Sequence, residues 1–223
     1  MPLAEPVPLD VLEQDDDLLA VNKPAGIVVH PTYRNVSGTL LNGILWHLRD
    51  RPDVRPGLVS RLDKDTSGIV LVALSPGAHA RIQRDASAGL VTKRYVAIVR
   101  GRPTPESGVI KLPLRRDPAD RRRVIAHDTG VACETRYTVV SSNGEESVVE
   151  CELVTGRTHQ IRVHLAASGW PIVGDPVYGS ADPRIARQGL HAWQITMPHP
   201  FSREVLRIEA PLPADMKFLM AKT

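Results

Sequence analysis

The sequence predicts an α+β protein with a mixed, mostly antiparallel sheet and flanking helices. Segments with strand character outnumber helical ones, and several follow one another directly, as antiparallel strands do. The 223 residues, 42% hydrophobic and 24% charged, can bury one ordinary globular core. No internal repeat, linker or low-complexity tract is found, so we expect one domain over residues 1–223.

The first half of the chain predicts an extended arm, four strands and two helices. Three prolines in the first ten residues indicate the arm. Apolar or alternating runs predict strands at Val11–Glu13, Leu18–Asn22, Leu58–Leu62 and Ile69–Leu74. Helical spacing of apolar residues predicts a helix over Leu40–Leu48, with Ser37 or Thr39 as its cap. The pair Ser75-Pro76 starts a second helix, which Gly89 ends.

The second half is predicted to be mainly strand. The strands are expected at Arg94–Val99, Thr135–Val140, Val148–Val154, Leu190–Thr196 and Val205–Ile208. Thr158–Ser168 predicts a helix that ends at Gly169, and a short final helix follows Pro213. Arg115–Arg123 holds five arginines in nine residues without periodicity, which indicates a loop.

Charge and cysteine content narrow the class of protein. A net charge of +3 permits a nucleic-acid partner without requiring one. Cys133 and Cys151 form no C-x-x-C pair, so neither a zinc site nor a redox motif is predicted, and we expect both to be reduced and buried. No signal-like or membrane-spanning segment is found, so a cytoplasmic location is expected.

The segment GLVSRLDKDTSGIVLVAL carries the first candidate for chemistry. It places Asp63 where a predicted strand ends and a glycine-containing loop begins. A carboxylate on a rigid strand end can act on a group held in a cleft. The alternative is a carboxylate that only caps its own turn, and the segment by itself favours that interpretation.

Two further segments carry candidate binding residues. In the predicted helix, His159 and Arg162 are three residues apart and would share one face, with Ile161 on the apolar side. Arg157 lies near the start of this helix, where backbone N–H groups attract anions. By itself the segment also fits a half-buried helix with a solvated side. Tyr95, in TKRYVAIVRG, fits a core aromatic residue.

Together these segments closely resemble the RluA-type family of RNA pseudouridine synthases. Residues 61–68 match the family motif RLD-x-x-TSG, and Lys93 and Tyr95 match its K-x-Y strand. Residues 156–164 match GR-[ST]-HQ-[IL]-R-x-H. The NKPAG motif at residues 22–26, GD-x-x-YG at 174–179 and LHA at 190–192 also stand in the family order. The resemblance therefore covers Leu18 to Pro211. Several motifs in a fixed order make the turn-and-core alternatives improbable.

The resemblance implies the pseudouridine synthase fold, with a central active-site cleft, and a role for each matched residue. Asp63 would be the nucleophile, and Arg162 would pair with it and keep it ionised. Tyr95 would pack against the target uracil, and Arg61 would enter the RNA stack when the target base is flipped out. The expected substrate contacts are Arg61, Arg157, His159, Ile161, Thr66, Lys93, Arg115, Arg116, Arg121, Arg122 and Arg123.

The implied reaction suits a carboxylate. It breaks the N-glycosidic bond of uridine, rotates the ring and rejoins it through carbon. The target must first leave the RNA stack, which favours a uridine in a loop. The carboxylate can then attack the anomeric carbon of the sugar or add to the uracil ring, and the sequence leaves both routes open. Neither route needs a metal or an organic cofactor, so none is expected.

The expected partner is a compact stem-loop of tRNA or rRNA, bound by a monomer without an N-terminal accessory domain. The arginine run can contact phosphates, or it can be a solvated loop that pairs with Asp117 and Asp120, and the two interpretations are evenly balanced. The chain departs from the family pattern at Ser60, where a histidine is usual, and at Val131, where a lysine is common. Both changes bear on RNA contacts rather than on the nucleophile.

Two other classes of protein share these features. A non-enzymatic RNA-binding protein would keep the scaffold, but it has no need for Asp63, Tyr95 and Arg162 together. A glycosylase would use a similar carboxylate and release free uracil. Pseudouridine in an unbroken RNA chain would exclude both.

Overall fold

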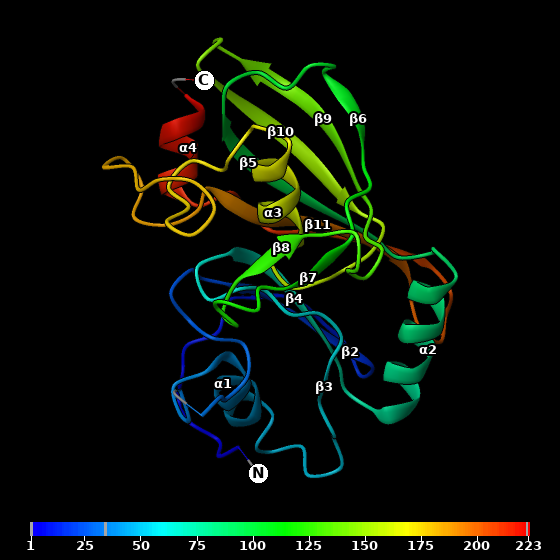
Figure 1. Ribbon diagram of the computed structural model, residues 1–223. Helices are drawn as coiled ribbons and strands as arrows, with labels where there is room; N and C mark the ends of the chain where they lie inside the picture. The colour runs from blue at the N-terminus through cyan, green and yellow to red at the C-terminus, as the bar shows by residue number, and fades with distance from the viewer. Residues whose placement is uncertain (1, 34, 222) are drawn as a thin grey trace. The chain divides into compact units, whose positions relative to one another are not determined.

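The structure, a computed structural model, describes residues 2–33, 35–221 and 223 and divides the chain into two compact units (Figure 1). The first unit comprises Met1–Thr92 and Trp193–Pro211, and the second Lys93–Ala192 and Leu212–Thr223. Met1, the first residue of the expected arm, lies outside the described residues. That the whole chain acts as one domain stays a prediction.

The first unit is a sheet in the order β1-β2-β4-β11, with β3 against β4 and β12 against β11. The pairs β1/β2, β2/β4, β3/β4 and β11/β12 are all antiparallel. The strands are β1 (Val11–Gln14), β2 (Leu18–Lys23), β3 (Gly57–Leu58), β4 (Ser67–Ala73), β11 (Leu190–Pro198) and β12 (Val205–Glu209). The first three residues of β11 belong to the second unit.

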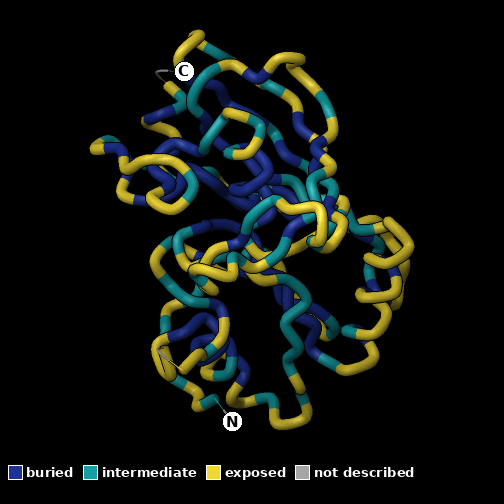
Figure 2. The backbone as a smooth tube through the Cα atoms, in the orientation of Figure 1, coloured by how far each residue is buried: buried dark blue, intermediate teal, exposed yellow. Residues whose placement is uncertain are grey.

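The strands β2 and β4 are buried on both faces (Figure 2). Their side chains point alternately to two apolar clusters, as the two-residue period of a strand requires. Leu71 belongs to the cluster that contains Ile82 of α2 (Pro76–Ser87), whereas its neighbour Val72 belongs to the cluster that contains Ile44 of α1 (Leu40–His47). Continuous apolar runs are typical of strands covered on both sides.

Both helices of the first unit begin and end as predicted. Of the two candidate caps for α1, Thr39 is the N-cap, and it forms a reciprocal capping box with Asn42. Ser75 caps α2 by accepting the amide of Ala78 at 3.1 Å. Gly89 follows the end of α2 with a φ of 74°, the left-handed conformation that a helix terminus favours.

The second unit holds a four-stranded antiparallel arrangement, β5-β10-β9-β6, and a separate two-stranded hairpin. Two helices, α3 and α4, complete it. Its elements are β5 (Thr92–Arg100), β6 (Ser107–Ile110), β7 (Leu114–Arg116), β8 (Val124–Ala126), β9 (Thr135–Ser142), β10 (Glu146–Leu153), α3 (Gln160–Ala167) and α4 (Ala214–Met220).

The predicted strand Leu58–Leu62 is too long, because only Gly57–Leu58 is a strand. The amide of Val59 still donates to the carbonyl of Leu71 at 2.9 Å. The amide of Leu71, however, donates to the Ser60 hydroxyl at 3.0 Å instead of to a carbonyl. The Ser60 hydroxyl therefore takes the place of a backbone carbonyl as hydrogen-bond acceptor, at the point where the chain turns toward Asp63.

The predicted helix Thr158–Ser168 begins two residues too early. His159 has a φ of 55°, in the left-handed region, and is the N-cap of α3. His159 therefore lies outside the helix, but His159 and Arg162 both contact Tyr178, so their side chains lie on the same side, as expected. The predicted end is confirmed, because Gly169 follows the helix with a φ of 89°.

Part of the arginine run is a β-hairpin rather than a loop. Arg115 pairs with Ile125 and Arg116 with Val124, and residues 117–123 connect the two strands. We call residues 114–126 the arginine hairpin. Its apolar residues Leu114 and Val124 belong to one buried cluster with residues of the second unit.

Two other expectations concern the cysteines and membranes. Cys133 and Cys151 are buried free thiols, as predicted. Within residues 2–33, 35–221 and 223, no helix is both long enough and apolar enough to cross a membrane.

Candidate functional site

Asp63 lies in the loop between β3 and β4 of the first unit, with its side chain half-buried. The amide of Thr66 donates to the Asp63 carbonyl at 3.2 Å. The next carbonyl, of Lys64, accepts the Gly26 amide at 2.9 Å and the Lys23 ammonium at 2.9 Å. The backbone that directly follows the Asp63 side chain is therefore fixed by residues of the same unit.

The residues before Asp63 alternate between solvent and core. Leu62 packs against the apolar cluster beneath α1, whereas Arg61 is exposed. Thr66 is buried. The RLD triplet thus has one anchored residue between a cation that reaches solvent and a half-buried carboxylate.

Arg162 lies on α3 in the second unit, 5% exposed, and is held by Asp175. Its Nε and Nη2 donate to the two carboxylate oxygens at 2.7 and 2.9 Å, the bidentate geometry of a strong ion pair. Burial by itself would raise the pKa of Asp175. The hydrogen bonds and charge of Arg162, with the amides of Val177 and Tyr178, outweigh burial and lower that pKa.

Tyr178 connects several of the candidate residues. Its hydroxyl lies 2.7 Å from Nδ1 of His159 and accepts the amide of Val124 at 2.9 Å. The Arg162 guanidinium carbon lies 4.9 Å from the centre of its ring, and that of Arg123 lies at 5.8 Å. Asp175 and Tyr178 both belong to the GD-x-x-YG motif, so the motif could have marked them, but no role was predicted for either.

The K-x-Y strand places Lys93 and Tyr95 on the same side of β5. Tyr95 is 7% exposed and pairs across the sheet with Cys151. Burial lowers the pKa of Lys93. Ile161, on α3, is 4% exposed.

Arg157 is exposed in the turn that precedes α3. Its amide donates to the side-chain carbonyl of Gln160 at 3.0 Å. Gln160 in turn donates to the Thr135 hydroxyl, and that hydroxyl bonds to Nδ1 of His164 at 2.9 Å. A buried polar network therefore fixes the start of α3, and Arg157 keeps its side chain available to solvent.

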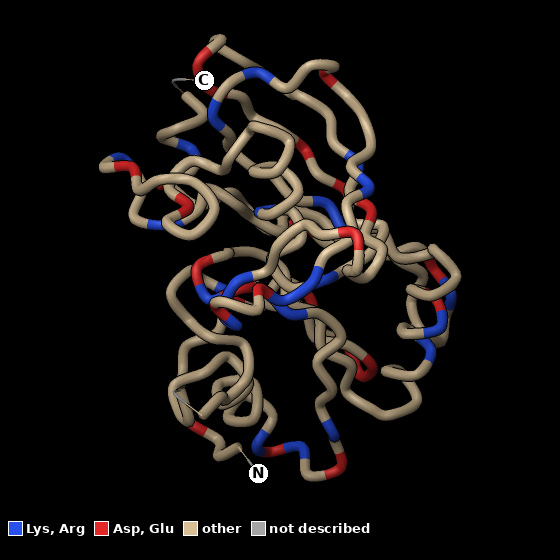
Figure 3. The backbone as a smooth tube through the Cα atoms, viewed as in Figure 1, with Lys and Arg blue, Asp and Glu red and all other residues tan. Residues whose placement is uncertain are grey.

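The structure bears on one of the two interpretations of the arginine run, pairing with Asp117 and Asp120, and phosphate contact stays a prediction. Arg122 binds Asp120 through two contacts of 2.9 Å, and these hydrogen bonds lower the pKa of Asp120 to about 2. Asp117 instead accepts the amide of Ala119. Two aspartates thus lie between the arginines of the hairpin (Figure 3). Arg116, Arg121 and Arg123 are exposed.

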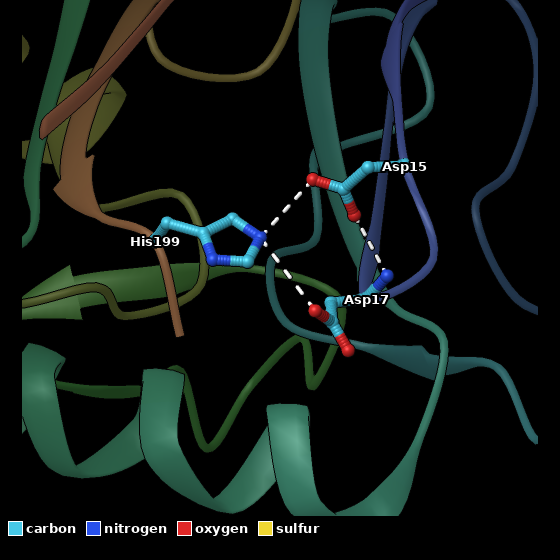
Figure 4. Close-up of side chains that lie close together, drawn as sticks. All are labelled: Asp15, Asp17 and His199. Carbon is cyan, nitrogen blue, oxygen red and sulfur yellow. Dashed lines mark hydrogen bonds and ion pairs between the residues drawn. The ribbon is translucent and has the colours of Figure 1, made fainter. Parts of the chain in front are cut away.

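Asp15, Asp17 and His199 form a cluster at the turn between β1 and β2 (Figure 4). Nε2 of His199 lies 3.1 Å from Asp15 and 3.7 Å from Asp17. The other ring nitrogen, Nδ1, accepts the amides of Phe201 and Ser202, so the proton of the neutral ring is on Nε2. A metal-bound histidine normally donates through its second nitrogen, so this cluster fits a hydrogen-bonded turn rather than a metal site.

A family model described as RNA pseudouridylate synthase matches residues 17–167, more than half of the chain. The chain belongs to this family. Members of the RNA pseudouridylate synthase family are isomerases that modify RNA, so the predicted family and class of enzyme are confirmed.

Curated relatives in the family match nearly the whole chain. It is 42% identical to "Ribosomal large subunit pseudouridine synthase D" of Nitrosomonas europaea, over 97% of this chain and 66% of that protein. It is also 42% identical to the uncharacterized RNA pseudouridine synthase YlyB of Bacillus subtilis, over 98% of this chain and 74% of that protein. The chain thus spans about two thirds of the length of the first relative and about three quarters of the second.

Solved structures of pseudouridylate synthases share the fold. Human RNA Pseudouridylate Synthase Domain Containing 1 superposes with a TM-score of 0.74 at 27% identity, over 95% of this chain and 86% of that one. Human RNA Pseudouridylate Synthase Domain Containing 4 superposes with a TM-score of 0.75 at 24% identity, over 96% and 92%. The predicted α+β class with its mixed sheet is confirmed.

The predicted site residues of this family member are divided between the two units. Arg61, Asp63 and Thr66 belong to the first unit. The second unit contains the others, which are Lys93, Tyr95, Arg115, Arg116, Arg121, Arg122, Arg123, Arg157, His159, Ile161 and Arg162. A pocket shared by Asp63, Tyr95 and Arg162 would join the two units, and it stays a prediction.

Proposed function

We propose that this chain converts a specific uridine of structured RNA to pseudouridine, with the Asp63 carboxylate as nucleophile and the target base flipped out of the stack. The observation that carries the proposal is the loop around Asp63. Its backbone is held at the Asp63 and Lys64 carbonyls, while its side chain stays half-exposed. A nucleophile needs this combination of fixed position and access to substrate.

The reaction balances without a co-reactant. The bond between the anomeric carbon and N1 of uracil breaks, and a bond between that carbon and C5 forms. A proton leaves C5, and N1 gains one. Asp63 would assist the first step by attacking either the anomeric carbon or the uracil ring, and both routes remain within the proposal.

Residues of the second unit would complete the site in this proposal. Arg162 would face Asp63 and favour its ionised form. The bidentate pairing of Arg162 with Asp175 supports this role, because it fixes the direction of the guanidinium before substrate binds. Tyr95 and Ile161 would form the apolar wall that shields the detached uracil from water. The exposed side chain of Arg61 would fill the space that the flipped base leaves.

The target that we propose first is RNA of the large ribosomal subunit. Support comes from the relative in Nitrosomonas europaea, which is described as a large-subunit pseudouridine synthase. A stem-loop of tRNA is the second candidate class. Action as a monomer in the cytoplasm is part of the same proposal.

The test uses RNA from a strain that lacks this protein, incubated with wild type, Asp63→Asn or Asp65→Asn and mapped for pseudouridine. Asp65 is the matched control, a second half-buried carboxylate of the same loop. Wild type and Asp65→Asn should convert one or a few uridines. Asp63→Asn should be at least about 1,000-fold slower, because it removes the nucleophile.

Three outcomes would contradict the proposal. Conversion by Asp63→Asn at a near normal rate would refute the role of this residue. Free uracil and an abasic site would identify a glycosylase. RNA refolding without any pseudouridine would identify a non-enzymatic RNA-binding protein. The same map would distinguish rRNA from tRNA as the target.

A further inference from the structure

The hydroxyl of Tyr178 links the arginine hairpin to the start of α3. It accepts the backbone amide of Val124, in β8, at 2.9 Å. It also lies 2.7 Å from Nδ1 of His159, the N-cap of α3. Because the amide can only donate, the hydroxyl proton is available to His159, and both contacts are satisfied at once.

The ring of Tyr178 adds contacts with two arginines. The guanidinium carbon of Arg162 lies 4.9 Å from the ring centre, and that of Arg123 lies 5.8 Å from it. Both distances fall within the range of cation–π attraction. Arg162 is buried, whereas Arg123 is exposed on the hairpin, so one ring contacts both an interior cation and a surface cation.

The turn that carries Tyr178 is built on the same carboxylate that holds Arg162. Oδ1 of Asp175 accepts Nη2 of Arg162 at 2.9 Å, the amide of Val177 at 2.9 Å and the amide of Tyr178 at 3.2 Å. A movement of Tyr178 would therefore disturb the pairing of Arg162. Apolar contacts support the arrangement, because Tyr178 packs against the buried cluster that contains Val124.

We propose that Tyr178 is a positioning residue that fixes the arginine hairpin relative to Arg162. The same side chain would influence both how tightly the hairpin binds RNA phosphates and the direction of the buried Arg162 guanidinium. The proposal rests on the proposed function, since it takes RNA as the partner of the hairpin. It assigns separate tasks to the two parts of the side chain. The hydroxyl holds the hairpin, and the ring supports Arg162.

The decisive variant is Tyr178→Phe, which removes the hydroxyl and keeps the ring. The matched control is Tyr137→Phe, because Tyr137 is a tyrosine of the same unit whose hydroxyl also forms a hydrogen bond, donated to the Pro105 carbonyl at 3.1 Å. Tyr178→Phe removes both hydrogen bonds of the hydroxyl; loss of the bond to the hairpin amide should raise KM for RNA about three- to tenfold and leave kcat within about twofold. Tyr178→Leu, which also removes the ring, should lower kcat as well. Tyr137→Phe should change neither constant.

A second readout is independent of catalysis. In the free protein, amide hydrogen exchange at Val124 should be about three- to tenfold faster in Tyr178→Phe and unchanged in Tyr137→Phe. Unchanged exchange and unchanged KM in Tyr178→Phe would overturn the inference. A wild type that forms no pseudouridine would instead refute the proposed function, and the exchange at Val124, together with direct RNA binding, would still decide the role of Tyr178.

Discussion

At the scale of single residues, Lys23 is a fully buried cation at the base of the Asp63 loop. Its ammonium donates to the carbonyls of Pro24, Ile27 and Lys64 at 2.8, 3.0 and 2.9 Å. A charge can stay in a protein interior only when polar groups replace its water. Here those groups include the carbonyl next to Asp63, so the charge of Lys23 orders the loop that carries the proposed nucleophile.

Replacing Lys23 by methionine tests this role. The variant should lose roughly 2–4 kcal/mol of folding free energy, because three partly buried hydrogen bonds from a charged donor are lost. Pseudouridine formation should also slow, because the backbone beside Asp63 is released. The control is Lys64→Met, the same chemical change at an exposed neighbour. Urea unfolding compares the two, and equal stability of both variants would show that Lys23 does not hold the loop.

At the scale of elements, α3 and β9 are joined by His164. Nε2 of His164 lies 3.0 Å from the carbonyl of Leu112, and Nδ1 bonds to the Thr135 hydroxyl. Burial lowers the pKa of His164, and the hydrogen bond to Leu112 opposes this only in part. The unfolded chain therefore binds a proton more readily than the folded one, so stability rises with pH in this range.

The pH dependence of stability tests the state of His164. Its contribution should be complete above about pH 6.5, the ordinary histidine value, and should be lost as the pH falls from there through the lowered pKa. His164→Gln should be about 1–3 kcal/mol less stable at pH 8, because buried hydrogen bonds are lost. The difference between variant and wild type should shrink toward pH 5. Parallel stability curves, measured by urea unfolding from pH 5 to 8, would contradict this assignment.

The elements that the sequence predicts correctly are those with local causes. Thr39 and Ser75 cap their helices through their own side chains, and β2 and β4 follow from apolar runs. The predicted strand Leu58–Leu62 is wrong because its end depends on a hydrogen bond to a residue distant in the sequence. The Ser60 hydroxyl ends β3 because it binds the amide of Leu71 on another strand.

The candidate site also combines features with local causes, which the sequence predicts, and contacts between residues distant in the sequence, which it does not. The motif around Asp63 is read directly from the sequence, because loop and strand end are adjacent in the chain. Asp175 lies 13 residues from Arg162, and Tyr178 lies 54 residues from Val124. No periodicity connects such positions, so their contacts could be found only from the fold.

At the scale of the whole molecule, a net charge of +3 gives little long-range attraction for RNA. Binding must then depend on where arginines gather. On the hairpin, Arg121, Arg122 and Arg123 are all exposed, and Arg122 is paired with Asp120. Because that pairing offsets the charge of Arg122, Arg121 and Arg123 should supply more of the phosphate contacts.

A double variant tests this surface. Arg121→Ala with Arg123→Ala should weaken RNA binding and reduce the slope of log affinity against log salt by about 1–2, the value for two lost phosphate contacts. The control is Arg49→Ala with Arg51→Ala, which lowers the net charge equally, from +3 to +1. Filter binding at several salt concentrations compares them. Equal slopes for both double variants would remove the hairpin from the interface.

The division of the chain into interleaved units has a consequence for its synthesis. The first unit needs Trp193–Pro211, and the second needs Leu212–Thr223, where Asp215 binds Arg187 of the same unit. Residues up to Pro211 for the first unit, and up to Thr223 for the second, must therefore be synthesised before that unit can be completed. β4 would lack its partner β11 until more than a hundred further residues had been synthesised. Nascent chains would be vulnerable to aggregation throughout that interval.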